Sequence, residues 1–337
     1  MHMDLPPFTP PALLKNAHLQ SLFNSVGPRP WQVARRSTAM VAHSQPLLLE
    51  GRHNEQPVKL LAHFDQTDRD NRRLAILLHG WEGSAESTYL LSAADHLYRR
   101  GFNILRVNLR DHGESFHLNK GTFNSTLSDE VSGAIADFLG QYPHDERYMA
   151  GYSLGGNFAL RIAADDQAAL HLSTVVAFCP PVDPAHAMDR IMAGPAYRNY
   201  FLDKWSSSLR KKLHYHPRLL GGENLPRFES LTDLNDYFVE HLTPFVDAGD
   251  YFSSYSLCGD RLRELRVPAY LITSDDDPIV PVSDLGLINR PAALKVEVTP
   301  LGGHCGFIEN FKLDSWSDRC LSLIFNHHRN NSESAPR

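Results

Sequence analysis

Residues 151–157 read Gly-Tyr-Ser-Leu-Gly-Gly-Asn and fit the pattern G-x-S-x-G, with Ser153 at its centre. A predicted strand at 148–150 precedes this stretch, and an apolar stripe within 158–163 predicts a helix after it. On such a sharp turn from strand to helix, a serine has strained backbone angles and projects its hydroxyl above the edge of a sheet. Glycines two residues to either side are needed where neighbouring chains pass too close for a Cβ atom. We therefore interpret Ser153 as a nucleophile.

A serine hydroxyl is a weak nucleophile near neutral pH, so it needs a base, and the base needs an acid to orient it. His304 fits the base because it lies in a glycine-lined stretch, 301–307, after the last predicted strand. Three aspartates at 275–277 follow the preceding strand, which is where the acid of such a triad stands in chain order. The run Asp-Pro-Ile-Val-Pro selects Asp277 as the acid, and Asp276 is the alternative.

Acyl transfer to a serine passes through a tetrahedral oxyanion, and the loss of one donor to it costs roughly 3–4 kcal/mol. The backbone N–H of Leu154, directly after the nucleophile, is one predicted donor. The second is the N–H of Trp81, in a stretch of the H-G-x-x-G type that follows the first buried strand. Gly80 and Tyr152 are predicted to contact the substrate, and Trp81, Tyr152 and further aromatic residues would form an apolar acyl pocket.

From about residue 45, short apolar runs alternate with amphipathic stretches, as in βαβ units. The predicted strands are 74–78, 102–107, 148–150, 174–178, 268–273 and 295–299, and predicted helices include 87–100 and 127–139. The alternation stops in the aromatic-rich segment 182–266, which we interpret as a helical cap, with ordinary peripheral helices of one domain as the alternative. Residues 1–181 and 267–329 then form the core, on which an N-terminal extension, 1–44, packs. The polar residues 330–337 predict a disordered tail.

The composition excludes several classes of function. The chain has 337 residues and a net charge of −6, and its densest basic run, 210–212, is expected on a solvated helix face, so nucleic acid is not an expected partner. No apolar run approaches the roughly 18 residues of a membrane span, and the proline-rich start does not resemble a signal peptide. Four widely spaced cysteines predict reduced thiols in a cytoplasmic protein, and no metal-binding spacing is present, so neither metal nor cofactor is expected.

Taken together, these motifs resemble the YheT-like branch of the α/β-hydrolases, a group to which esterase activity is ascribed. Residues 16–21, Asn-Ala-His-Leu-Gln-Ser, are similar to its N-x-H-x-Q-T signature, and residues 108–115 are similar to its R-x-x-G-x-S loop. The resemblance covers about residues 10–325 and implies an α/β fold with a mostly parallel eight-stranded sheet, flanking helices and a helical cap. The chain departs from the family at 273–275, where Thr-Ser and a third aspartate replace the usual Asn-Ala or His-Ala before the aspartate pair.

The predicted function is hydrolysis of carboxylic esters with short to medium acyl chains, through a Ser-His-Asp triad and an acyl-enzyme intermediate. The expected substrate is a small-molecule or lipid-like ester. An acyltransferase that passes the acyl group to an alcohol is one alternative. A non-catalytic binding protein of the same fold is another, although such proteins usually lose the serine, the histidine or the glycines.

Overall fold

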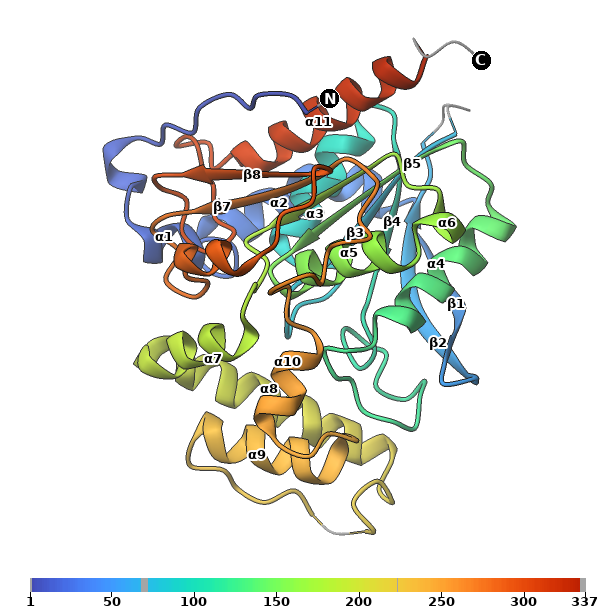
Figure 1. Ribbon diagram of the computed structural model, residues 1–337, viewed down its shortest axis with the longest axis vertical. Coiled ribbons are helices and arrows are strands. Elements are labelled where there is room, and N and C mark those ends of the chain that lie inside the picture. The colour runs from blue at the N-terminus through green and yellow to red at the C-terminus, as the bar shows by residue number, and fades with distance from the viewer. Residues whose placement is uncertain (1, 68–71, 223, 334–337) are drawn as a thin grey trace.

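The computed structural model describes residues 2–67, 72–222 and 224–333, and these residues contain one central sheet of eight strands (Figure 1). The strands are β1 Gln45–His53, β2 Gln56–Asp65, β3 Arg73–Leu78, β4 Asn103–Val107, β5 Glu146–Tyr152, β6 Thr174–Phe178, β7 Ala269–Ser274 and β8 Leu294–Thr299. Their order across the sheet is β1-β2-β4-β3-β5-β6-β7-β8. Strand β2 runs antiparallel to both β1 and β4, and the remaining pairs are parallel. The predicted mostly parallel, eight-stranded sheet is thus confirmed.

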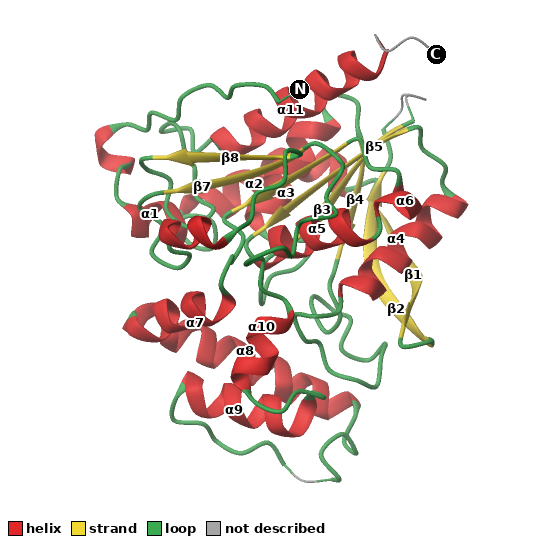
Figure 2. Ribbon diagram, viewed as in Figure 1, coloured by secondary structure: helices red, strands yellow, loops and turns green. Residues whose placement is uncertain are grey.

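Helices cover both faces of the sheet, as Figure 2 shows. The helices are α1 Ala17–Leu22, α2 Pro28–Val41, α3 Thr88–Tyr98, α4 Ser128–Gln141, α5 Leu154–Asp165, α6 Gln167–Leu170, α7 Pro184–Ala193, α8 Pro195–Tyr215, α9 Leu231–Leu242, α10 Ala248–Ser254 and α11 Trp316–Glu333, with 3-10 turns η1 Ala12–Leu14 and η2 Val282–Leu287. In the part of the chain that is described, no helix combines the length and apolar character that crossing a membrane requires.

Strand β3 lies inside the sheet, and all six of its residues are buried. Its alternate side chains point to opposite faces. Leu74, Ile76 and Leu78 join one apolar cluster with α4 and α5, whereas Ala75 and Leu77 join a second cluster with α3 and α11. Both faces of the strand are covered, which is why residues 74–78, after Arg73 at its start, are all apolar.

Helices α7 to α10 all lie between β6 and β7, within the segment 182–266 where a helical insertion is expected. In Figure 1 they lie together, to one side of the sheet. The other end of the chain differs from the prediction. Helix α11 continues through Glu333, so 330–333 complete its last turn instead of starting a disordered tail, and 334–337 lie outside the described residues.

The parallel strands β3, β5, β6, β7 and β8 place the loops at their carboxyl ends on the same edge of the sheet. These loops begin near His79, Ser153, Cys179, Asp275 and Pro300. Every candidate site residue predicted from the sequence lies on or next to one of these loops. The topology therefore gathers residues that are far apart in the chain.

The packing of the glycines at the turn after β5 gives a first prediction. A Cβ atom at Gly155 would lie 2.4 Å from the backbone oxygen of His79, whereas one at Gly140, on the exposed side of α4, would meet nothing within 4 Å. We expect Gly155→Ala to destabilise the protein by about 1–3 kcal/mol or more. The matched change Gly140→Ala should instead stabilise it by about 0.4–1 kcal/mol. Urea denaturation measures both, and equal effects would contradict this account.

Candidate active site

Ser153 stands between the end of β5 and the start of α5, with φ 53° and ψ −122°. A residue other than glycine rarely adopts a positive φ, and such strain persists only where the surroundings enforce it. A Cβ atom at Gly151 would lie 2.0 Å from the carbonyl oxygen of Gly155, so the two glycines of the motif are required by close packing. The N–H of Ser153 donates to the carbonyl of Phe178 at 2.7 Å, which fastens the turn to the neighbouring strand β6.

His304 lies within hydrogen-bond distance of both Ser153 and Asp277. Its Nε2 is 2.9 Å from Ser153 Oγ, and its Nδ1 is 2.9 Å from Asp277 Oδ2. Asp276, the alternative acid, is directed elsewhere and accepts a hydrogen bond from the N–H of Gly303 at 2.8 Å. The structure therefore places Asp277, and not Asp276, beside the imidazole.

The carboxylate of Asp277 is completely buried and is held in place by backbone groups. Its Oδ1 accepts from the N–H groups of Ile279 and Val280, at 2.8 and 2.9 Å. Burial of the imidazole by itself lowers the pKa of His304, but the charges of Asp277 and Cys305 and the hydrogen bond to Asp277 raise it to about 9. The surroundings of His304 thus favour the protonated imidazolium.

The loop after β3 is fixed by a buried histidine. His79 Nε2 accepts from the N–H of Leu109 at 3.0 Å, so its Nδ1 carries the proton and donates to the carbonyl of Gly80 at 2.8 Å. Burial holds the pKa of His79 well below its ordinary value, which keeps the ring neutral for this arrangement. The N–H of Gly83 donates to the same Gly80 oxygen at 3.0 Å. Because the peptide bond is planar and trans, fixing this carbonyl also fixes the N–H of Trp81, which points the opposite way.

Trp81 and Leu154, the predicted oxyanion donors, both line the cavity into which Ser153 opens. Among residues 2–67, 72–222 and 224–333, neither of their N–H groups donates to another protein atom. Leu154 is the first residue of α5, where the helix carries a partial positive charge. Gly80 packs against Ser153, because a Cβ atom there would lie 3.1 Å from Ser153 Cβ.

The cavity beside Ser153 has a volume of about 1360 Å³, and its lining includes apolar side chains from α7, α8 and α10. The ring of Trp81 stacks on Phe201 of α8, with centroids 4.7 Å apart and planes 8° from parallel. Tyr152 also lines the cavity, but its side chain is 1% exposed and packs in the core, 4.9 Å from the ring of Phe178. Because Tyr152 is buried in this way, the aromatic side chains of α8 contribute more apolar surface to the cavity than Tyr152 does.

The comparison with protein families agrees with this geometry. Residues 75–312 match the model of the alpha/beta hydrolase family. The chain belongs to the α/β-hydrolase family. An esterase from Pyrococcus furiosus, Pf2001, has the same fold, with a TM-score of 0.58, 17% sequence identity, and coverage of 97% of this chain and 99% of that one.

Three curated relatives of this α/β-hydrolase are similar in sequence. YheT from Escherichia coli K12, to which its name ascribes an esterase activity, is 24% identical over 89% of this chain and 87% of its own length. The embryogenesis-associated protein EMB8 of Picea glauca is 23% identical over 71% of this chain, and the match spans only 54% of EMB8. The medium-chain fatty acid ethyl ester synthase/esterase 2 of Saccharomyces cerevisiae is 21% identical over 75% of this chain and 61% of its own length. The resemblance to the YheT-like branch is thereby confirmed.

The N-terminal signature of this α/β-hydrolase holds the histidine loop. Ser21 Oγ accepts from the N–H of His304 at 2.8 Å, and Gln20 makes hydrogen bonds with both the N–H and the carbonyl of Ile308, at 2.7 and 3.1 Å. A Cβ atom at Gly303 would lie 2.3 Å from the carbonyl oxygen of Ala17. From the sequence, this motif was only a family marker, and its contact with the site was not predicted. Gln20 is 1% exposed. A polar residue within this family motif was the signal in the sequence that could have prompted a search for a buried partner.

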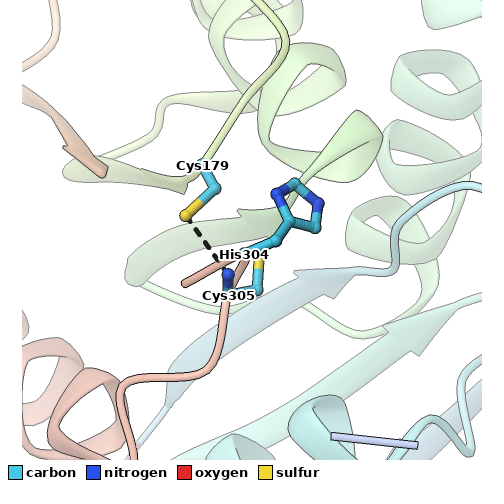
Figure 3. Close-up of side chains that lie close together, drawn as sticks. All are labelled: Cys179, His304 and Cys305. Carbon is cyan, nitrogen blue, oxygen red and sulfur yellow. Dashed lines mark hydrogen bonds between the residues drawn. The ribbon is translucent and has the colours of Figure 1, made fainter. Parts of the chain in front are cut away.

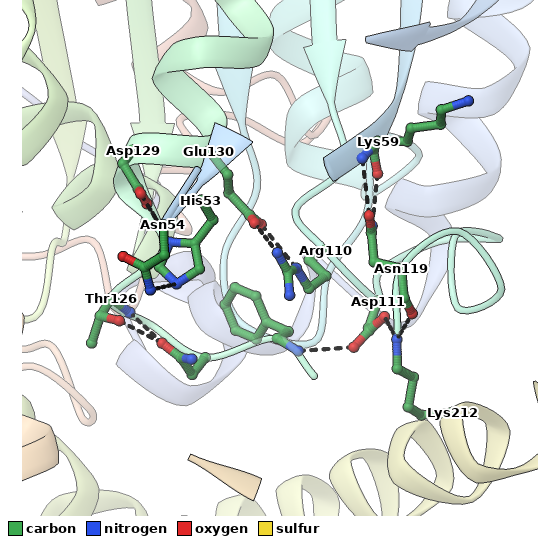
Figure 4. Close-up of polar contacts among 12 residues, drawn as sticks. His53, Asn54, Lys59, Arg110, Asp111, Asn119, Thr126, Asp129, Glu130 and Lys212 are labelled. Carbon is green, nitrogen blue, oxygen red and sulfur yellow. Dashed lines mark hydrogen bonds and ion pairs between the residues drawn. The ribbon is translucent and has the colours of Figure 1, made fainter. Parts of the chain in front are cut away.

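The second family marker, residues 108–115, is tied to its surroundings by buried ion pairs (Figure 4). Arg110 pairs with Glu130 of α4, and Lys212 Nζ reaches from α8 to Asp111 Oδ1 at 2.7 Å. The expectation that the basic run 210–212 lies on a solvated helix face is therefore wrong for Lys212, which is 1% exposed. The lysine turns inward because Asp111 and the carbonyl oxygen of Asn119 satisfy its charge and its donors.

The contact between His304 and Asp277 predicts how the histidine titrates. We expect its imidazole to lose a proton near pH 9 in the wild type, because the charge of Asp277 stabilises the protonated form. Asp277→Asn removes that charge, so burial should then bring the pKa of His304 below its wild-type value. Asp276→Asn is the matched control and should leave the pKa of His304 within about one unit of the wild-type value. NMR titration of the ring protons measures all three, and equal shifts in the two variants would refute the assignment.

Proposed function

We propose that this protein is a serine hydrolase that cleaves carboxylic esters, with Ser153 as nucleophile, His304 as base and Asp277 as the orienting acid. The observation that carries the proposal is the line of 2.9 Å contacts from Ser153 through His304 to Asp277, at the wall of a large cavity. The esterase and ester synthase names of relatives support the same class of reaction. In this proposal the core, 1–181 and 267–329, holds the catalytic residues, and 182–266 forms a cap over them.

Ester cleavage proceeds in two steps. The neutral His304 takes the proton of Ser153 as the hydroxyl oxygen attacks the ester carbonyl, and the negative oxygen that forms is stabilised by the N–H groups of Trp81 and Leu154. The imidazolium then protonates the leaving alcohol, which leaves an acyl-enzyme. Water attacks the acyl-enzyme by the same sequence of proton transfers, and the acid is released. Asp277 holds the ring so that Nε2 faces the hydroxyl, and no cofactor takes part.

The substrate we propose has a short to medium acyl chain. The cavity of about 1360 Å³ is large enough for such a chain, and side chains of Ile191, Phe201 and Phe252 give it an apolar lining. The yeast relative is named for medium-chain fatty acid ethyl esters, which supports the same class. Gly80 would lie beside the bound ester group, since it packs against Ser153.

Reaction with a fluorophosphonate, followed by hydrolysis of p-nitrophenyl esters of increasing acyl length, tests this function. We expect the wild-type protein to be labelled and to hydrolyse the short and medium esters, with kcat/KM rising with pH until His304 loses its proton near pH 9. Ser153→Ala should abolish labelling and reduce hydrolysis by a factor of about 10⁴ or more. Equal labelling of both proteins would contradict the assignment of the nucleophile.

Acyl transfer to an alcohol is the second candidate function, and the ester synthase/esterase name of the yeast relative favours it. The two functions share the acyl-enzyme and differ in what attacks it. Adding ethanol to the hydrolysis assay separates them. Formation of ethyl ester at the expense of the free acid supports transfer, and unchanged release of acid leaves hydrolysis alone.

Helix α8 holds the loop that carries the proposed Trp81 donor. Ser208 Oγ donates to Glu82 Oε2 at 2.6 Å, and Glu82 has a positive φ of 55°. The ring of Trp81 packs against both Phe201 and Trp205 of the same helix. A shift of α8 would therefore carry the Trp81 amide away from the oxyanion.

This contact predicts a kinetic effect of a residue outside the triad. We expect Ser208→Ala to lower kcat on the order of tenfold with little change in KM. The reason is that a displaced Trp81 N–H would stabilise the oxyanion of the transition state less, while binding of the uncharged ester would change little. Glu82→Gln keeps an acceptor for Ser208 and should retain most of the activity. Asn199→Ala, at an exposed position of the same helix outside the cavity lining, is the control. A raised KM with unchanged kcat for Ser208→Ala would show that the contact shapes substrate binding instead.

A further inference from the structure

Two thiols and the candidate catalytic histidine come together where the loop after β6 meets the loop after β8 (Figure 3). Three atoms lie within 4.8 Å of one another: the Sγ atoms of Cys179 and Cys305 and one ring nitrogen of His304. The N–H of Cys305 donates to Cys179 Sγ at 3.3 Å, so the two loops are already joined through sulfur. The proposed reaction uses only the histidine of the three.

We propose that Cys179, Cys305 and His304 form a binding site for a thiophilic divalent cation such as Zn²⁺, and that the bound ion inhibits the enzyme. Two thiolates and an imidazole are the ligands that zinc prefers in proteins, at about 2.3 Å for sulfur and 2.0–2.1 Å for nitrogen. Tetrahedral bonds of those lengths separate the ligand atoms by about 3.5–3.8 Å. The three atoms, which lie within 4.8 Å of one another, therefore need to approach by at most about 1.3 Å, and water or Ser153 Oγ can fill the fourth position.

Backbone strain at the two cysteines supports a ligand role. Cys179 and Cys305 both have positive φ values, 45° and 57°, which residues other than glycine adopt rarely and mostly at functional sites. Each thiol would lose its proton when the ion binds, because thiolate is the form that binds metal.

The site is open to an ion from the substrate side, because His304 and Cys305 both line the cavity. In the metal-free protein both ring nitrogens are engaged, one with Ser153 and the other with Asp277. A cation that takes either nitrogen breaks one of these contacts. Occupation of the site would thus remove the base from the nucleophile or free it from the acid that orients it.

Inhibition by Zn²⁺ alone, measured with a p-nitrophenyl ester under a phosphine reductant, tests the consequence for activity. We expect Zn²⁺ to inhibit the wild type, and Cys179→Ser and Cys305→Ser each to raise the inhibition constant by at least about tenfold. Cys258→Ser, a half-buried thiol outside the cluster, should keep the wild-type constant. Equal inhibition of all four proteins would place the ion on other residues and overturn the proposal. Inhibition that is seen only when the reductant is left out would also overturn the proposal, since it would indicate a disulfide instead of a bound ion.

Binding is tested separately from activity, because inhibition rests on the proposed function and binding does not. Co²⁺ added to Ser153→Ala protein should give the charge-transfer absorbance of cobalt–thiolate bonds, and equimolar Zn²⁺ should remove it. The band should be absent when Cys179→Ser is added to this variant. Absence of the band in Ser153→Ala itself refutes the site, whether or not the cysteine variants fold. A band together with an inactive wild type would retain the site and reject the esterase function.

Discussion

The close approach of the Ser153 turn to strand β3 is the constraint on which the rest of the site depends. Gly151 and Gly155 lie so near other backbone atoms that a single Cβ would collide with a carbonyl oxygen. This packing is possible only because β3 and β5 are adjacent parallel strands that end at the same edge. The same contact brings the 79–83 loop against the nucleophile, so the strained serine and the proposed oxyanion donor are positioned by one interaction.

Three segments outside the sheet then hold the loops in place. The N-terminal helix α1 supports the histidine loop through Ser21 and Gln20. Helix α8 holds the 81–82 backbone through Ser208 and an aromatic stack. The loop after β4 is anchored by Lys212, and such buried ion pairs are costly to break because one charge would be left without a partner. Loops that would otherwise be mobile are thus fixed relative to Ser153.

Electrostatics at His304 follows from this packing. The buried carboxylate of Asp277, with backbone donors on one oxygen, stabilises the positive ring and raises the pKa of His304. The same close packing leaves Cys179 and Cys305 next to the ring. The surroundings that stabilise the protonated ring of His304 therefore also place two sulfur atoms within reach of a ring nitrogen.

Much of the fold and part of the site could be predicted from the sequence. The strands at 74–78, 174–178 and 295–299 were predicted within about one residue of β3, β6 and β8. The first two are largely apolar runs because both faces of these strands are buried, whereas the edge strand β8 is only partly buried and alternates valines with Lys295 and Glu297. Ser153 and His304 could be predicted as site residues because each lies in a short glycine-containing pattern that is continuous in the chain.

In the sequence the run Asp-Pro-Ile-Val-Pro favours Asp277, but Asp276 stays an alternative, since neighbouring residues in a turn point in different directions. The inward position of Lys212, the bond from Ser21 to His304 and the meeting of Cys179 with Cys305 were not predicted. The sequence by itself determined the strands, the turn after 148–150 and the candidate nucleophile, because their patterns lie within short continuous stretches of the chain. Only the tertiary structure placed Asp277 beside the imidazole and showed the supports of each loop and the thiol pair, because these depend on which strands lie side by side in the sheet.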